Sequence, residues 1–265
     1  MSLLVLNGTK IQAYTPPPPP SGSGFNLLRD FNTGIPGTEA ERAADAFDDR
    51  AGDSLYTTAE AFEGGQGCSL TVTGGTYGSG VFGGVINFPE QVRSGDTLWI
   101  DLMIKVPAGF VIETPGNGSL KYLRVRMQTA ANGQNGYFDL QLQDDDKTVS
   151  EFRMLREGQN VWQNFGADGV LTRDTWHRHT LCMKMDKTLQ ANGGTSRIRF
   201  WQNTTLLVDS ATTRTFLDTT DYCDSLWLFT YWNGTAPQTQ TLYVDRIRIS
   251  TDVVPAWASG LEGVA

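Results

Sequence analysis

Residues 121–128 have the sequence Lys-Tyr-Leu-Arg-Val-Arg-Met-Gln. Side chains alternate between the two faces of a β-strand. The apolar residues of this stretch fall on one face: Leu123, Val125 and Met127. The other face carries an aromatic ring, two guanidinium groups and an amide: Tyr122, Arg124, Arg126 and Gln128. Neighbours on one face are about 7 Å apart, a spacing that suits a chain of sugar hydroxyls or carboxylates. A solvated sheet face explains the same pattern, and both interpretations stay open for this strand alone.

Three further segments repeat this alternation, namely residues 137–143, 176–185 and 197–201. If their polar faces lie together on one sheet, aromatic rings and guanidinium groups line a groove. The rings would stack on sugars, and the guanidinium groups would bind carboxylates or sulfates. The residues expected to bind carbohydrate in this groove are Tyr122, Arg124, Arg126, Gln128, Tyr137, Gln141, Arg197, Arg199 and Trp201.

Composition narrows the class of protein. The chain has 265 residues, enough for one all-β domain, and it contains 29 glycines and 11% aromatic residues. Its net charge of −8 argues against a nucleic-acid partner bound by general phosphate attraction. No apolar run is long enough to span a membrane, and the first residues lack the basic region and cleavage site of a signal peptide. We therefore expect no membrane and no nucleic-acid partner.

The cysteines and histidines form no recognisable metal motif. Cys68, Cys182 and Cys223 are far apart and odd in number, which favours buried, reduced thiols. The aspartates at 144–146 and at 48, 49 and 53 could ligate calcium, but solvated turns explain them better. The sequence therefore predicts no metal site and no cofactor.

The chain divides into three parts. Residues 1–15 contain two short segments around an Asn-Gly-Thr turn, a hairpin signal, but two strands alone bury too little to be stable. Residues 16–24 begin with five prolines and continue with Gly and Ser, which is typical of a stiff spacer followed by a flexible joint. We expect residues 1–15 to dock onto another protein, residues 16–24 to link, and residues 25–265 to form the folded domain. An N-terminus without a partner is the alternative.

Alternating segments separated by Gly, Asn and Asp turns predict an all-β, two-sheet antiparallel sandwich. One helix is expected, over residues 38–49, where Thr38 and Glu41 have capping-box spacing. The expected strands cover residues 26–32, 69–72, 83–87, 97–106, 121–128, 137–143, 151–156, 176–185, 197–201, 204–208, 225–232 and 241–250.

The order of these segments resembles the concanavalin A-like jelly roll of lectin-like domains and polysaccharide lyases. The resemblance covers about residues 25–250. It rests on Phe-Asn-Thr-Gly at 31–34, Gly-Asp-Thr-Leu-Trp at 95–99 and Val-Pro-Ala-Gly-Phe at 106–110. Leu-Lys-Tyr-Leu-Arg at 120–124, Trp-His-Arg at 176–178, Arg-Phe-Trp-Gln-Asn at 199–203 and the closing segment at 242–249 complete it. It implies the fold more strongly than any activity.

Among jelly-roll enzymes, a lyase acting on a uronic acid must neutralise the substrate carboxylate and abstract the C5 proton. Tyr122 and Tyr137 are the candidates for base and acid, and His177 or His179 for a helper. The histidines alternate with Leu181 and Met183, however, so a structural role is the stronger interpretation for both. A glucanase signature of paired carboxylates is missing from the sequence.

A docking peptide, a proline spacer and a jelly roll without a signal peptide also resemble the appendage proteins of tailed-phage virions. The resemblance implies a decoration or fibre protein, made in the host cytoplasm and displayed on the virion surface, where it binds an acidic host or environmental polysaccharide. Many copies on one particle would add avidity. A uronate lyase and a structural decoration domain without ligand are the alternatives. An oligomer is compatible with all three.

Overall fold

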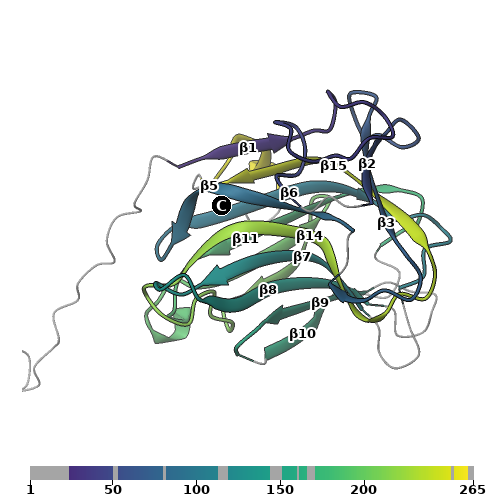
Figure 1. Ribbon diagram of the computed structural model, residues 1–265. Coiled ribbons are helices and arrows are strands. Elements are labelled where there is room, and N and C mark those ends of the chain that lie inside the picture. The colour runs from purple at the N-terminus through teal and green to yellow at the C-terminus, as the bar shows by residue number, and fades with distance from the viewer. Residues whose placement is uncertain are drawn as a thin grey trace, which may run out of the picture.

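The computed structural model describes residues 24–49, 53–79, 82–112, 119–143, 151–159, 161–165, 171–251 and 254–261. These residues form two antiparallel sheets packed face to face (Figure 1). The β6 sheet contains, in order, β13 (Thr205–Ser210), β12 (Arg197–Gln202), β11 (Trp176–Lys184), β6 (Thr97–Lys105), β15 (Gln240–Ser250), β3 (Gly67–Val72) and β2 (Ser54–Thr57), and β1 (Asn26–Arg29) also pairs with β15. The β7 sheet contains β10 (Val161–Phe165), β9 (Glu151–Arg156), β8 (Gln134–Gln143), β7 (Ser119–Gln128), β14 (Tyr222–Thr235) and β4 (Tyr77–Ser79), and β5 (Gly84–Arg93) also pairs with β14.

The all-β jelly-roll prediction is confirmed. Each expected strand is present with ends shifted by a few residues, and β2, β4 and β10 are additional. The only helical elements among the described residues are two short 3₁₀ turns, η1 (Gln190–Asn192) and η2 (Ala256–Ala258). Residues 1–23 lie outside the described residues, so the docking segment and the linker stay predictions.

The helix expected over residues 38–49 is wrong. This stretch consists of turns and isolated bridges, and Arg42 has a φ of 57°. Asp45 is nearly buried, and its carboxylate accepts hydrogen bonds from the Thr33 amide at 2.7 Å and the Tyr56 hydroxyl at 3.1 Å. Tertiary contacts, among them those of the Asp45 carboxylate, therefore override the high helix propensity of the Ala, Glu and Arg residues in this stretch.

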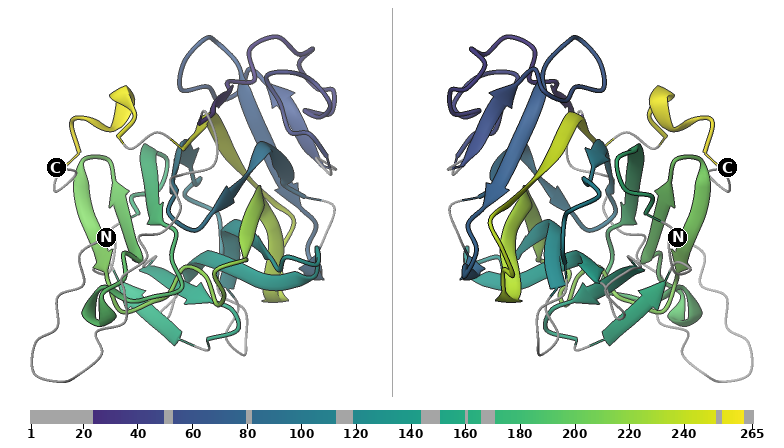
Figure 2. Two further views of the ribbon diagram at one scale, coloured as in Figure 1. Left: turned by 90° about the vertical axis from the view of Figure 1, so that its left-hand side faces the viewer. Right: turned by 90° about the vertical axis from the view of Figure 1, so that its right-hand side faces the viewer.

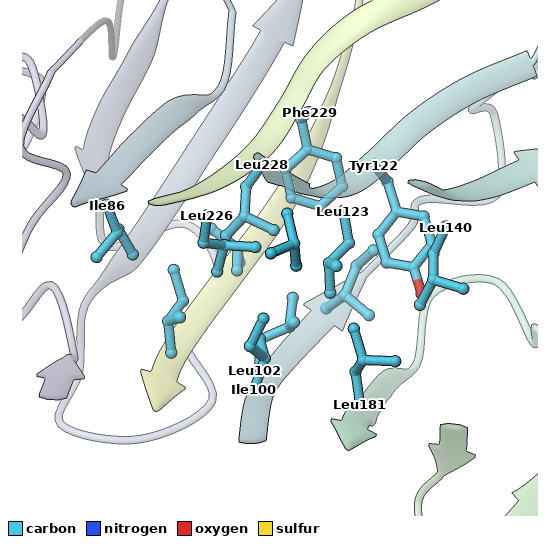
Figure 3. Packing of buried hydrophobic residues seen from close by; sticks show 14 of the residues in the cluster. Ile86, Ile100, Leu102, Tyr122, Leu123, Leu140, Leu181, Leu226, Leu228 and Phe229 are labelled. Atoms are coloured by element: carbon cyan, nitrogen blue, oxygen red, sulfur yellow. The ribbon is translucent and has the colours of Figure 1, made fainter. Parts of the chain in front are cut away.

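The main core lies between the two sheets, where alternate side chains of each strand interdigitate. Figure 3 shows Ile100, Leu102 and Leu181 of the β6 sheet facing Leu123 and Leu228 of the β7 sheet. The described cysteines are buried and free, as expected.

A second apolar cluster covers the outer face of the β6 sheet. Trp99 and Trp201 stack there with their ring centroids 5.8 Å apart, and Trp257 packs edge-on against Trp99. Trp257 belongs to η2, the C-terminal turn that lies against this side of the sandwich (Figure 2). The outer face of this sheet is therefore partly covered by the end of the chain.

Two β-bulges lie side by side in the β7 sheet. Opposite β8, the register of β7 shifts between Lys121 and Leu123, so Tyr122 is an extra residue. Opposite β7, the register of β14 shifts between Leu228 and Tyr231, and Phe229 there has a φ of 55°. Each bulge changes which residues of its strand point outward.

Candidate functional site

The outer face of the β7 sheet gathers charged and aromatic side chains from β7, β8 and β14. Lys121 comes just before the Tyr122 bulge and points outward. After the bulge the alternation of side chains resumes, so Arg124 and Arg126 point outward as well. The register forms three cross-strand rows: Lys121 with Gln141 and Tyr231, Arg124 with Asp139 and Trp227, and Arg126 with Tyr137 and Ser225. Residues far apart in sequence therefore become neighbours.

The centre of this face is a network of two cations and two carboxylates. Lys121 Nζ lies 2.8 Å from both Asp139 Oδ2 and Glu157 Oε1. Arg124 donates from Nε to Asp139 Oδ1 at 2.8 Å, and its terminal nitrogen lies 3.5 Å from Glu157. Asp139 is fully buried, whereas the Glu157 side chain is 27% exposed. We call these four residues, with Tyr137 and Tyr231, the Lys121–Arg124 cluster.

Aromatic rings cover the cations. The Arg124 guanidinium lies 3.8 Å from the centroid of the Tyr137 ring and 5.0 Å from that of Tyr231, and Lys121 Nζ lies 4.9 Å from the Tyr231 centroid. Trp227 packs edge-on against Tyr137, with centroids 5.8 Å apart. Cation–π contacts of this kind hold flat rings in fixed orientations. Tyr231 and Trp227 stay partly exposed.

Burial and neighbouring charges shift the pKa values of several side chains in the cluster. Burial raises the pKa of Asp139, although the nearby Arg124 and Lys121 oppose the shift. Burial also acts on Glu157, but the hydrogen bond and the charge of Lys121 outweigh it and hold the pKa of Glu157 below its ordinary value. Burial raises the pKa of Tyr137. Tyr137 is therefore a protonated phenol at neutral pH, and Glu157 is an ionised, weakly basic carboxylate.

A second ion pair flanks the cluster. Arg126 donates from two nitrogens to the Asp224 carboxylate at 2.8 and 2.7 Å, and Gln128 donates to the same carboxylate at 3.3 Å. The hydrogen bond to Asp224 is the main cause that raises the pKa of Arg126. The Arg126 side chain is 29% exposed. It is therefore the most accessible of the three β7 cations.

Five of the predicted carbohydrate-binding residues share this face: Arg124, Arg126, Gln128, Tyr137 and Gln141. Tyr122 does not. As the extra residue of the bulge it points into the core, where it packs against Phe152, His179 and Phe229. Its predicted place on the polar face is wrong because the bulge breaks the alternation on which the prediction rested.

The single predicted groove is also divided. Arg197, Arg199 and Trp201 lie on β12, in the β6 sheet, and face outward on the opposite side of the sandwich. Trp201 is fully buried beneath the C-terminal turn. Placing these residues in a groove with Arg124 is therefore wrong, since the alternation within a strand does not reveal which sheet the strand joins.

His177 and His179 face the core, as the structural interpretation of them expects. His177 Nε2 lies 3.0 Å from the Thr172 carbonyl oxygen, and His179 Nε2 lies 3.3 Å from Gln202 Oε1. Burial lowers the pKa of His177 and lowers that of His179 to about 3. His177 therefore does not lie on the face that carries Tyr137.

Three members of the face were not predicted from the sequence: Lys121, Glu157 and Trp227. Lys121 and Tyr231 reach it only because of the two bulges, and Glu157 follows the end of β9 in a turn. Trp227 fits a buried central strand, yet it is only partly buried here. The Asn-Gly pair at 233–234 led to the expectation that Tyr231 and Trp232 surface at the edge of the groove. In the structure β14 continues through this pair to Thr235, Tyr231 is partly exposed, and Trp232 is fully buried.

Neither a metal site nor a membrane helix is found within the described ranges. No group of three His, Cys, Asp or Glu residues there could hold a metal ion. Of the calcium candidates, Asp48 binds the Arg29 guanidinium and the Asn87 amide, and residues 144–146 lie outside those ranges. No described helix is both long and apolar enough to cross a bilayer.

Comparison with known proteins gives structural likeness without sequence likeness. No family model and no curated protein matches the chain. Among solved structures, the alginate lyase Aly36B aligns with a TM-score of 0.60 at 16% identity, over 84% of this chain and 96% of that one. The two chains therefore share the two-sheet jelly-roll fold.

Two further structures share this jelly roll. An endo-β-1,4-glucuronan lyase from the fungus Trichoderma reesei aligns with a TM-score of 0.53 at 11% identity, over 86% of this chain and 96% of that one. The alginate lyase vAL-1 from a Chlorella virus aligns with a TM-score of 0.51 at 11% identity, over 75% of this chain and 89% of that one. At these identities the likeness shows the jelly-roll fold alone. Any ligand or reaction of this chain must be argued from its own side chains.

Proposed function

We propose that this jelly roll binds an acidic polysaccharide across the outer face of the β7 sheet. The observation that carries the proposal is the placement of two partly exposed aromatic rings beside a row of cations on adjacent strands. Trp227 and Tyr231 supply flat surfaces for sugar rings, Tyr137 packs beneath them against Arg124 and Trp227, and Arg126 supplies a partly exposed guanidinium for a carboxylate. The solved lyases named above act on alginate and glucuronan, which are polymers of this class.

The protonation states of the cluster favour binding over cleavage. Lys121 lies between two carboxylates, and its Nζ is 2.8 Å from an oxygen of each. Tyr137 is protonated because burial raises its pKa. Asp139 is buried within its ion pairs, and the lowered pKa of Glu157 makes it a weak base. The cluster therefore offers hydrogen-bond donors to a ligand more readily than it offers a base to a reaction.

Glu157 competes with an acidic ligand for the same cations. It is the more exposed of the two carboxylates, and its removal leaves Lys121 paired with Asp139 alone. We therefore expect Glu157→Gln to tighten binding to alginate or glucuronan several-fold, and Arg126→Gln to weaken it. Affinity electrophoresis at several salt concentrations measures both. Glu63→Gln, which breaks an ion pair with Arg246 elsewhere, is the matched control and should leave affinity unchanged. Equal binding by all four proteins would refute the proposal.

A uronate lyase is the second candidate. It is favoured by the 4.9 Å approach of Lys121 to the Tyr231 ring, because a variant of Aly36B with a lysine and a tyrosine replaced was solved with an alginate tetrasaccharide bound. A lyase would use a base at C5, an acid at the leaving oxygen and a donor on the carboxylate. Incubation with alginate, glucuronan and pectate, followed by ultraviolet absorbance of unsaturated uronate, tests it. A rise abolished by Lys121→Ala or Tyr231→Phe supports a lyase; a flat trace with retained binding leaves recognition as the function.

We further propose that the binding domain is displayed on a virion, with residues 1–15 docking onto a virion protein. The support is the sequence layout alone: a short N-terminal segment, five prolines and a Gly/Ser run before the domain. Purified particles assembled with a chain lacking residues 1–20 test the idea. Particles that still carry the truncated protein would contradict it.

A further inference from the structure

A pocket opens on the outer face of the β6 sheet, on the opposite side of the sandwich from the Lys121–Arg124 cluster. Its volume is about 450 Å³, within the range of small-molecule sites. Strands β6, β11 and β12 form its floor, and Val254 and the η1 region form its walls. Its lining includes Trp99, Lys184, Thr195, Arg197, Arg199 and Val254. We call it the Arg199 pocket.

The lining of this pocket is cationic although the whole chain is acidic. Lys184, Arg197 and Arg199 line it, and none of the described lining residues is a carboxylate. Asp209 lies beside it on β13 and binds Arg197 through both oxygens. Arg199 approaches the same carboxylate only to 3.6 Å. One carboxylate therefore serves two guanidinium groups, and Arg197 holds it more closely.

Two of the three cations have unused binding capacity. The Arg199 side chain is 14% exposed, and its buried Nε has no hydrogen-bond partner among the described residues. Lys184 donates to the Gly95 carbonyl oxygen and lies 3.5 Å from Thr97 Oγ1, both neutral, and it forms no ion pair with any residue that the structure describes. Both residues are partly exposed, and Arg199 shares Asp209 with Arg197, so an anion in the pocket would gain charge-assisted hydrogen bonds from both cations.

The remaining walls are rigid and suit a polyhydroxylated ligand. Trp99 is held by its stack on Trp201. Thr195 donates from its amide at 2.7 Å and from its hydroxyl at 2.9 Å to Asp186, which fixes the η1 side of the pocket. Its hydroxyl oxygen, the Thr97 hydroxyl and the Gln190 amide supply neutral hydrogen-bonding groups around the cations. A phosphate or sulfate ion would bind the cations but would leave these neutral hydrogen-bonding groups without a contact to the ligand.

We propose that the Arg199 pocket is a second ligand site, which binds the carboxylate of an acidic sugar between Arg199 and Lys184. The carboxylate accepts hydrogen bonds from the guanidinium and the ammonium, and the sugar hydroxyls meet the threonine and glutamine side chains. This site is independent of the polysaccharide face, because the two lie on the outer faces of different sheets.

Isothermal titration with sodium glucuronate tests the proposal, with glucose and inorganic sulfate at matched ionic strength as the comparison ligands. We expect saturable binding of glucuronate, weaker binding of sulfate, and no binding of glucose. Arg199→Gln and Lys184→Gln should each weaken glucuronate at least tenfold, since each removes a charge-assisted hydrogen bond in a partly buried site. Thermal melts of both variants establish that they fold.

Lys105→Gln is the matched control. Lys105 follows Trp99 by six residues on the same face of β6, and its ammonium binds Glu60 instead of the pocket. It should bind glucuronate as the parent protein does. Sulfate binding without glucuronate binding would overturn the proposal, as would glucuronate binding that survives both pocket substitutions. If Arg126→Gln abolished glucuronate binding and Arg199→Gln did not, the sugar would bind on the β7 sheet, and the proposal for the Arg199 pocket would be overturned.

Discussion

The hydroxyl of Tyr122 is buried in the core and has no hydrogen-bond partner among the described residues. An unsatisfied buried hydroxyl costs about 1–3 kcal/mol. We therefore expect Tyr122→Phe to preserve or raise the free energy of unfolding, by up to about 1 kcal/mol, and to leave polysaccharide binding unchanged. Urea unfolding and affinity electrophoresis measure the two. If Tyr122→Phe lost polysaccharide binding at an unchanged urea midpoint, Tyr122 would have to contact the ligand, and its assignment to the core would be contradicted.

The buried His179 makes the free energy of unfolding depend on pH. Burial lowers its pKa to about 3, whereas an unfolded histidine titrates near 6.5. The folded state thus holds a neutral imidazole, and its stabilising contribution is complete above pH 6.5. That contribution falls by about 1.4 kcal/mol for each pH unit below 6.5, until the folded pKa is reached. Unfolding measured from pH 7 to pH 4 should therefore show a shallower loss of stability in His179→Gln than in the parent chain. Parallel curves would contradict the assignment.

The difference between sequence and structure at this scale comes from one extra residue. Alternation correctly separates Leu123, Val125 and Met127 from Arg124, Arg126 and Gln128. It fails at Tyr122, because no glycine, asparagine or proline marks the bulge. Lys121, rather than Tyr122, therefore stands beside Arg124. A period-two pattern cannot reveal such a shift, since it assumes an unbroken strand.

At the scale of single elements, the bulge in β14 depends on a glycine in a neighbouring segment. Gly83 has a φ of +75°, and a Cβ atom there would lie 1.9 Å from the Leu228 carbonyl oxygen. Gly83→Ala should therefore lower the free energy of unfolding by more than about 2 kcal/mol, through backbone strain and steric clash together. It should also disturb Tyr231 and weaken polysaccharide binding.

Gly75→Ala is the control for that substitution. Gly75 has a similar φ of +87°, yet a Cβ atom there meets nothing within 4 Å. Its cost should be limited to the strain of about 1 kcal/mol. Chemical denaturation of the two variants separates strain from clash, and equal losses would show that contact with β14 does not matter.

The positions of the elements were predictable, but not their assignment to sheets. Gly, Asn and Asp turns mark the strand ends well, because these residues tolerate the backbone angles that turns require. Nothing in residues 197–201 indicates that β12 pairs with β11 instead of joining β7 and β8. Pairing depends on contacts between segments distant in sequence, and Arg199 and Arg124 consequently lie on different faces.

At the scale of the whole molecule, one continuous apolar core joins the two sheets, and no described cysteine forms a disulfide. We expect a single cooperative unfolding transition with the same midpoint by tryptophan fluorescence and by circular dichroism. Dithiothreitol should leave that midpoint unchanged. Two separated transitions, or a midpoint lowered by the reductant, would contradict this account of the core.

The attachment of β1 has a mechanical consequence. This strand has four residues, and β15 is its only partner among the described strands, with Asn26 opposite Ser250 and Arg29 opposite Ile247. Phe25 extends the pairing through hydrogen bonds with Thr251. A pull applied at residue 24 would load the Phe25 pair first and the Arg29 pair last, so the strand would peel away one pair at a time. Tension from the N-terminal side would thus detach β1, at low force, before it reached the two outer sheet faces on which ligand binding is proposed.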